Sequence, residues 1–240
     1  MKKAFKRAAI GLALALTFLG AVEWNGYHLF DRKDGTNVIS ETLKDSRQLT
    51  PGEIDLARGV FGDSIDYSKV RIFNRGWMGV FGNSGDMVTP NGNIYVAGDK
   101  SRSADFSQQD QSGQLMFIHE MTHVWQFQHG RAVRWDALKG WIGSGFNYQS
   151  TYGYNLDDVK DFRDLNIEQQ AHMVEDYLSA LQDLRNFGCT ESTTNRDFMC
   201  SVPAARMKEL AVKIKSSIPL PRMPVPQTFQ PATPPSPTLD

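Results

Sequence analysis

Two histidines four residues apart, His119 and His123, are the side chains in this sequence best suited to hold a metal ion. Residues at that spacing share one helix face, so both imidazoles can reach one ion, at about 2.0–2.1 Å from each nitrogen if it is zinc. Glu120 follows the first histidine and is rotated from it by about a third of a turn, beside the ion rather than on it. A carboxylate there can take a proton from a water molecule that the ion activates. The motif therefore predicts a zinc site, with His119 and His123 as ligands and Glu120 as the catalytic general base.

A catalytic zinc site needs a third protein ligand and leaves a fourth position to solvent. The residues after His123 do not continue the extended histidine motif, so the third ligand must come from another segment. Glu168, near the start of a later helical segment, is the first choice. His172 and Glu175, four and seven residues further on, share its helix face. The residue pattern alone leaves these alternatives open.

The histidine motif lies in a segment, about residues 112–128, that is predicted to be a buried helix ending at Gly130. Nearly every face of it is apolar, through Leu115, Phe117, Ile118, Met121, Val124, Trp125 and Phe127. Two imidazoles and a carboxylate in such surroundings cost several kcal/mol unless a charge compensates. A divalent cation supplies that charge directly.

The other expected elements are three helices and two short strands, over about residues 51–61, 164–187, 204–215, 70–73 and 94–96. Thr50, Pro51 and Glu53 form a capping box that should start the first helix. Gly188 should end the helix that carries Glu168. The predicted fold class is α+β, mainly helical with a small β-sheet.

Four segments are expected along the chain. Residues 1–22 combine a basic start with an apolar run too short to span a bilayer, which predicts a signal peptide or, because the cleavage signal is poor, an N-terminal membrane anchor. Residues 23–49 are a polar spacer, 50–218 the folded domain, and 219–240 a Pro-rich disordered tail. We therefore expect an exported protein: periplasmic, anchored in the inner membrane or secreted.

The two cysteines, Cys189 and Cys200, are separated by polar residues without metal-ligand spacing. In an exported protein such a pair most simply forms a disulfide, which would contribute about 2–3 kcal/mol. The alternative is a pair of free, buried thiols.

Composition indicates a soluble globular protein and argues against binding to nucleic acid. Hydrophobic residues make up 40% of the chain and charged residues 22%, as in a soluble globular protein. Lys and Arg number 26 against 27 Asp and Glu, so no excess of positive charge is available to neutralise a phosphate backbone. Nucleic acid is therefore not an expected partner.

The segments FIHEMTHVWQ and NIEQQA together resemble the gluzincin branch of zinc metallopeptidases, in which HExxH is followed on a later helix by a ligand Glu. This resemblance implies a zincin-like domain with His119, His123 and Glu168 as zinc ligands. Where that branch often has an Asp that orients a ligand histidine, this chain has His172. More narrowly, LTPGEIDLARGVFG, IDYSKVRIFN, TPNGNIYV and the histidine segment, within about residues 49–177, resemble bacterial Vgr-related or Rhs-type proteins, which are associated by name with secretion systems.

The resemblance to zinc metallopeptidases implies that the substrate is a protein or peptide whose peptide bonds are hydrolysed, and in an exported enzyme the peptide cross-link of peptidoglycan is a second expected substrate. A hydrogen-bond donor should face the oxyanion that forms on the substrate, and Tyr152, Tyr154, Tyr177 and His172 are equal candidates. The alternative is a non-catalytic protein, associated with secretion or binding the cell envelope, whose zinc site is structural or vestigial. The resemblance to Vgr-related proteins also implies an association with a secretion system.

Overall fold

The computed structural model describes residues 46–76, 87–96, 104–133, 136, 151–189 and 198–220. The expected targeting segment at 1–22, the spacer up to residue 45 and the tail from residue 221 lie outside these ranges. The chain divides into two units, Met1–Ser46 and Arg47–Asp240, and the fold is that of the second. None of the described helices is long and apolar enough to cross a membrane.

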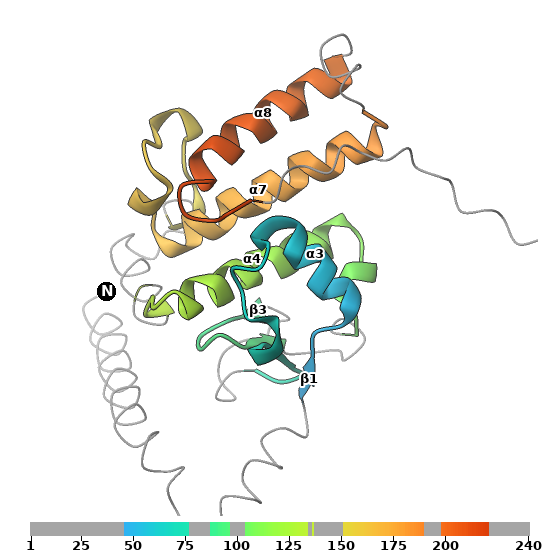
Figure 1. Ribbon diagram of the computed structural model, residues 1–240, viewed down its shortest axis with the longest axis vertical. Helices are drawn as coiled ribbons and strands as arrows, with labels where there is room; N and C mark the ends of the chain where they lie inside the picture. Colours follow the sequence, from blue (N-terminus) through green and yellow to red (C-terminus); the bar gives the residue numbers. More distant parts are fainter. Residues whose placement is uncertain are drawn as a thin grey trace, which may run out of the picture. The chain divides into compact units, whose positions relative to one another are not determined.

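Four helices and a small sheet form the fold, which confirms the α+β class. The helices are α3 (Pro51–Phe61), α4 (Gln111–Gln128), α7 (Ile167–Asn186) and α8 (Phe198–Ile214). Short 3-10 turns lie at Tyr67–Lys69 (η1), Phe106–Gln108 (η3), Leu156–Asp158 (η4) and Phe162–Asp164 (η5). Figure 1 shows α7 between α8 and α4, with α4 lying between α7 and the strands. This layering buries α4, the helix of the histidine motif.

The sheet has four short strands in the order β1-β2-β4-β3, namely β1 (Ser46–Gln48), β2 (Arg71–Phe73), β4 (Ile94–Val96) and β3 (Met87–Val88). Strands β2 and β4 are parallel, and β3 is antiparallel to β4 at the edge of the sheet. The sequence predicts β2 and β4 but neither β1 nor β3. Strand β1 comes from the end of the expected spacer, and Leu49 after it is buried.

Helix α3 begins as the sequence predicts. The Thr50 hydroxyl accepts a hydrogen bond from the Glu53 amide, and the Glu53 carboxylate accepts one from the Thr50 amide, at 3.1 and 2.8 Å. The same carboxylate, fully buried, accepts two hydrogen bonds from Arg47 and one from the Phe106 amide. Glu53 therefore connects the start of α3 to β1 and to η3.

Replacing Glu53 with Gln is expected to lower the free energy of unfolding by about 3 kcal/mol, because it removes the buried negative charge that accepts two hydrogen bonds from the Arg47 guanidinium, which is only 23% exposed. Urea unfolding monitored by circular dichroism measures the change. The control is Asp63→Asn, which breaks an exposed ion pair with Arg58 and should cost under about 1 kcal/mol. Equal losses in the two variants would contradict the structural role of Glu53.

Helices α4 and α7 run close to their predicted bounds. Helix α4 ends at Gln128, and Gly130 follows with a φ of +82°. The expected burial of α4 is confirmed for most of its apolar residues, but Phe127 is 42% exposed. Helix α7 begins at Ile167, three residues later than predicted, because Asn166 and Gln169 form a capping box at its start.

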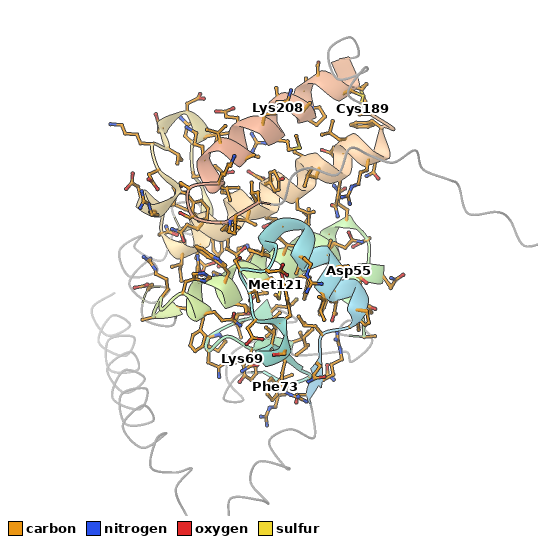
Figure 2. The ribbon with its side chains drawn as sticks, viewed as in Figure 1. Asp55, Lys69, Phe73, Met121, Cys189 and Lys208 are labelled. Atoms are coloured by element: carbon orange, nitrogen blue, oxygen red, sulfur yellow. A yellow bond between two sulfur atoms is a disulfide. The ribbon has the colours of Figure 1, made fainter. Side chains whose placement is uncertain are left out.

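The middle of α4 lies in the core of the fold. Its Met121 is fully buried there (Figure 2).

Helix α8 begins at Phe198, six residues before the predicted start, and contains Pro203 in its second turn. The predicted disulfide is present between Cys189, just after α7, and Cys200 in the first turn of α8. Figure 2 shows this bond at the label of Cys189, at the end of the α7 and α8 pair. The bond holds the start of α8 beside the end of α7.

Candidate metal centre

His119, His123 and Glu168 come together where the middle of α4 meets the first turn of α7. The Nε2 atoms of both histidines lie 3.3 Å from the same carboxylate oxygen, Oε2 of Glu168. One potential ligand atom from each of the three residues lies within 4.8 Å of the others. The packing of α4 against α7 thus brings the expected third ligand to the histidine pair.

This arrangement fits a zinc ion in both donor types and spacing. Zinc bonds of about 2.0–2.1 Å in a tetrahedral site place neighbouring donor atoms about 3.3–3.4 Å apart. Both nitrogen to oxygen separations to Glu168 equal that edge length. Two imidazole nitrogens and one carboxylate oxygen are also a donor set typical of catalytic zinc, with a fourth position left to solvent.

The two alternatives for the third ligand occupy other places. Glu175, two turns after Glu168, lies behind the first histidine, with its Oε2 atom 3.3 Å from Nδ1 of His119. Glu175 is therefore placed to orient the ring of His119. In the gluzincin peptidases that this chain resembles, an Asp at the position of His172 often has this role. His172 donates a hydrogen bond from Nδ1 to the backbone carbonyl of Tyr152, 3.2 Å away, and is not part of the metal-binding group.

The charges of these residues are strongly coupled. Burial disfavours the charged form of His119, but hydrogen bonds to Glu168 and Glu175 outweigh it and raise its pKa to about 10. Burial likewise opposes ionisation of Glu168, yet the charge of His123 and the hydrogen bond to His119 hold the pKa of its carboxyl well below the usual range. A metal ion must therefore displace protons from the imidazoles, so its affinity falls as the pH is lowered.

Glu120 is held by a residue that the sequence analysis did not identify. The Thr89 hydroxyl, one residue beyond β3, donates a 2.7 Å hydrogen bond to Oε2 of Glu120. Both side chains are buried, at 4% and 6% exposed, so this bond to a carboxylate is not weakened by solvent. The negative charge of Glu120 also contributes to the raised pKa of His119 and of His123.

Among the tyrosines proposed to face the oxyanion, Tyr154 and Tyr177 have other roles. The Tyr154 hydroxyl donates to Asp176, which also accepts a hydrogen bond from Arg206 at 2.8 Å. Burial is the main cause that raises the pKa of Tyr154, and the bond to Asp176 adds to it. Tyr177 is 2% exposed and belongs to the hydrophobic core.

Tyr152 is the remaining tyrosine, and its ring is tilted against His119 with the two ring centres 6.1 Å apart. The ring of His172 is edge-on to the ring of Tyr154, with the ring centres 5.9 Å apart, and His172 is not part of the metal-binding group. Tyr152 is therefore the tyrosine candidate whose ring lies beside a residue of the metal-binding group.

The sequence does not predict three buried residues near the metal centre, namely Thr89, Gln126 and Gln170. Thr89 precedes the Pro-Asn-Gly-Asn turn, which the sequence identifies only as a turn. Gln126 lies three residues after His123, and Gln170 interrupts the apolar stripe of its helix. A polar residue in such a stripe is the signal that could have identified the glutamines, because a buried amide requires hydrogen-bond partners.

Comparison with known proteins gives two similar proteins. No protein-family model matches the sequence. Over 133 residues the chain is 45% identical to the type VI secretion system spike protein VgrG2b of Pseudomonas aeruginosa, in an alignment that covers 55% of this chain and 13% of that protein. The structure is similar to the solved effector domain of Pseudomonas aeruginosa VgrG2b, with a TM-score of 0.52 and 31% identity, over 82% of this chain and 98% of that domain.

Proposed function

This chain belongs to the family of the VgrG2b effector domain, and on that premise we propose that it is a zinc-dependent peptidase associated with a type VI secretion system. The name of the relative supports the association with secretion and an exported or secreted location. It says nothing of hydrolysis, so the catalytic part of the proposal rests on the metal centre. The observation that carries it is the convergence of His119, His123 and Glu168 beside a buried Glu120.

The residues of the centre divide the chemistry among them. His119, His123 and Glu168 would hold the ion, which when bound polarises the scissile carbonyl and a water molecule. Glu120 takes a proton from the attacking water and delivers it to the leaving amine. Thr89 keeps one oxygen of Glu120 in place, so the carboxylate meets the substrate in one orientation.

The rival hypothesis is a non-catalytic, secretion-associated protein with a structural or vestigial metal site, and the comparisons by themselves are fully compatible with it. A structural zinc is normally closed by four protein ligands, and among the described residues the group holds three. A structural site also has no use for Glu120, whose burial beside the imidazoles is costly without a function. These two features favour the peptidase.

Cleavage of a peptide library by the zinc-loaded chain tests the proposal, with cross-linked peptidoglycan as a second substrate. We expect peptide-bond cleavage that a chelator abolishes and added zinc restores, with products identified by mass spectrometry. The cleaved sequences would also define the specificity. A zinc-loaded protein that cleaves neither substrate would support the non-catalytic alternative instead.

Replacing Tyr152 with Phe is expected to lower kcat by about 10²-fold, with KM and zinc content little changed, because it removes the proposed donor to the oxyanion. Steady-state kinetics on a peptide found by the library measure the effect. Tyr154→Phe is the matched control, since that hydroxyl is bonded to Asp176. A larger loss of kcat in Tyr154→Phe than in Tyr152→Phe would mean that Tyr154, not Tyr152, is the donor to the oxyanion.

A further inference from the structure

Two buried glutamines, Gln126 on α4 and Gln170 on α7, lie next to the metal centre and have no role in the mechanism above. They are 0% and 4% exposed, so their amides depend on protein partners. Gln126 contacts Nδ1 of His123, which is the ring nitrogen that does not face Glu168. The direction of each hydrogen bond in this cluster can be derived from the backbone.

The orientation of Gln170 follows from two carbonyl groups. Its side-chain nitrogen lies 3.1 Å from the carbonyl oxygen of Phe162 and 3.2 Å from that of Leu165. A carbonyl oxygen can only accept, so the amide nitrogen must be the atom on this side. The oxygen of Gln170 therefore faces Gln126, whose side-chain nitrogen donates to it at 2.9 Å.

The orientation of Gln126 follows in the same way. Its nitrogen also donates to the carbonyl oxygen of Ile167 at 3.0 Å, so its own oxygen is turned toward His123. That oxygen lies 2.8 Å from Nδ1, and because it can only accept, Nδ1 must carry a hydrogen. Nε2 is then the nitrogen that is left to bind an ion, on the side of Glu168.

These bonds also join the two helices that carry the ligands. Ile167 and Gln170 bracket Glu168 in the first turn of α7, while His123 and Gln126 lie on successive turns of α4. We propose that Gln126 and Gln170 are positioning residues that keep His123 protonated on Nδ1 and fix the first turn of α7 against α4. This inference rests on the proposed metal centre and names residues that set its affinity.

Zinc affinity, measured by competition with a chelator on the full chain, tests the inference. Gln126→Met is expected to raise the zinc Kd by about 10–100-fold, the usual effect of losing a partner of a ligand histidine. Gln170→Met should raise it less, because the carbonyl of Ile167 still orients Gln126. The matched control is Gln182→Met, another buried glutamine of α7, which donates to Gln114 of α4. It should leave the zinc Kd unchanged.

A second measurement separates positioning from simple destabilisation. In nitrogen-15 NMR spectra of the zinc-loaded protein, the Nδ1 proton of His123 should exchange slowly with solvent in the wild type and in Gln182→Met. It should exchange rapidly in Gln126→Met, whatever the thermal stability of that variant. If Gln126→Met does not fold, Gln170→Met decides with the same two measurements, and wild-type values for it would overturn the inference.

The zinc affinities and the NMR spectra together test two separate hypotheses: the positioning role of the glutamines and the proposed zinc peptidase function. Equal zinc Kd values for Gln126→Met and Gln182→Met would overturn the positioning role and leave the metal centre intact. A wild-type protein that binds no zinc would overturn both. Selective loss of affinity and of the His123 proton in Gln126→Met would support both.

Discussion

Replacing Glu120 with Gln is expected to lower peptidase activity by about 10²–10⁴-fold while zinc content stays at the wild-type level. The amide has the size of the carboxylate and can still accept the hydrogen bond from Thr89, so local packing is kept. It cannot accept a proton from the attacking water. Activity on a cleaved peptide and zinc content by elemental analysis, both on the same preparation, measure the two expectations.

The control for this variant is Asp55→Asn, which neutralises an exposed carboxylate on α3 (Figure 2). It should retain both zinc and activity. Wild-type activity in Glu120→Gln would remove Glu120 from its role as general base. Loss of zinc together with activity would mean that Glu120 helps to hold the ion.

Replacing Glu168 with Ala should weaken zinc binding more than replacing Glu175 with Ala. Glu168 places one oxygen 3.3 Å from Nε2 of both histidines, whereas Glu175 contacts only Nδ1 of His119, on the outer side of that ring. Loss of the outer partner should raise the zinc Kd by about 10–100-fold, and loss of the ligand should exceed that range. Chelator competition on both variants gives the comparison.

His172→Ala is the matched control, because His172 lies one turn after Glu168 on the same helix but outside the metal-binding group. Its zinc Kd should equal that of the wild type. The opposite order, with Glu175→Ala losing more zinc than Glu168→Ala, would refute the assignment of the third ligand. A strong loss in His172→Ala would do so as well.

Local signals account for the parts of the fold that the sequence predicts well. The start of α3 depends on Thr50 and Glu53, which are three residues apart and bond to each other's backbone. The end of α4 depends on a glycine with positive φ at Gly130. Such signals act between neighbours in the chain, so they can be recognised without knowing the tertiary structure.

The errors concern elements whose formation depends on distant partners. Strands β1 and β3 have three and two residues, too few to show an alternating pattern, and each exists because another strand lies beside it. Helix α8 starts before Pro203, where the sequence favours a helix boundary, and the disulfide from Cys189 to Cys200 holds its first turn. Neither outcome can be derived from neighbouring residues alone.

In the candidate metal centre, too, neighbouring residues determine some features and distant residues determine others. The spacing of His119, Glu120 and His123 by itself determines that two imidazoles share a helix face with a carboxylate beside them, because helical geometry relates residues within one turn. Only the packing of α4 against α7 decides among Glu168, His172 and Glu175, since all three satisfy the sequence pattern.

Tertiary structure alone also supplies the residues that support the centre. Thr89 reaches Glu120 from the edge of the sheet, 31 positions away, and Gln170 reaches Gln126 from 44 positions away. Hydrogen bonds of this kind depend on side-chain directions in a packed interior, to which sequence separation gives no guide. The sequence by itself thus determines the spacing of His119, Glu120 and His123 on one helix. The packing of α4 against α7 and against the edge of the sheet decides which distant residues surround them.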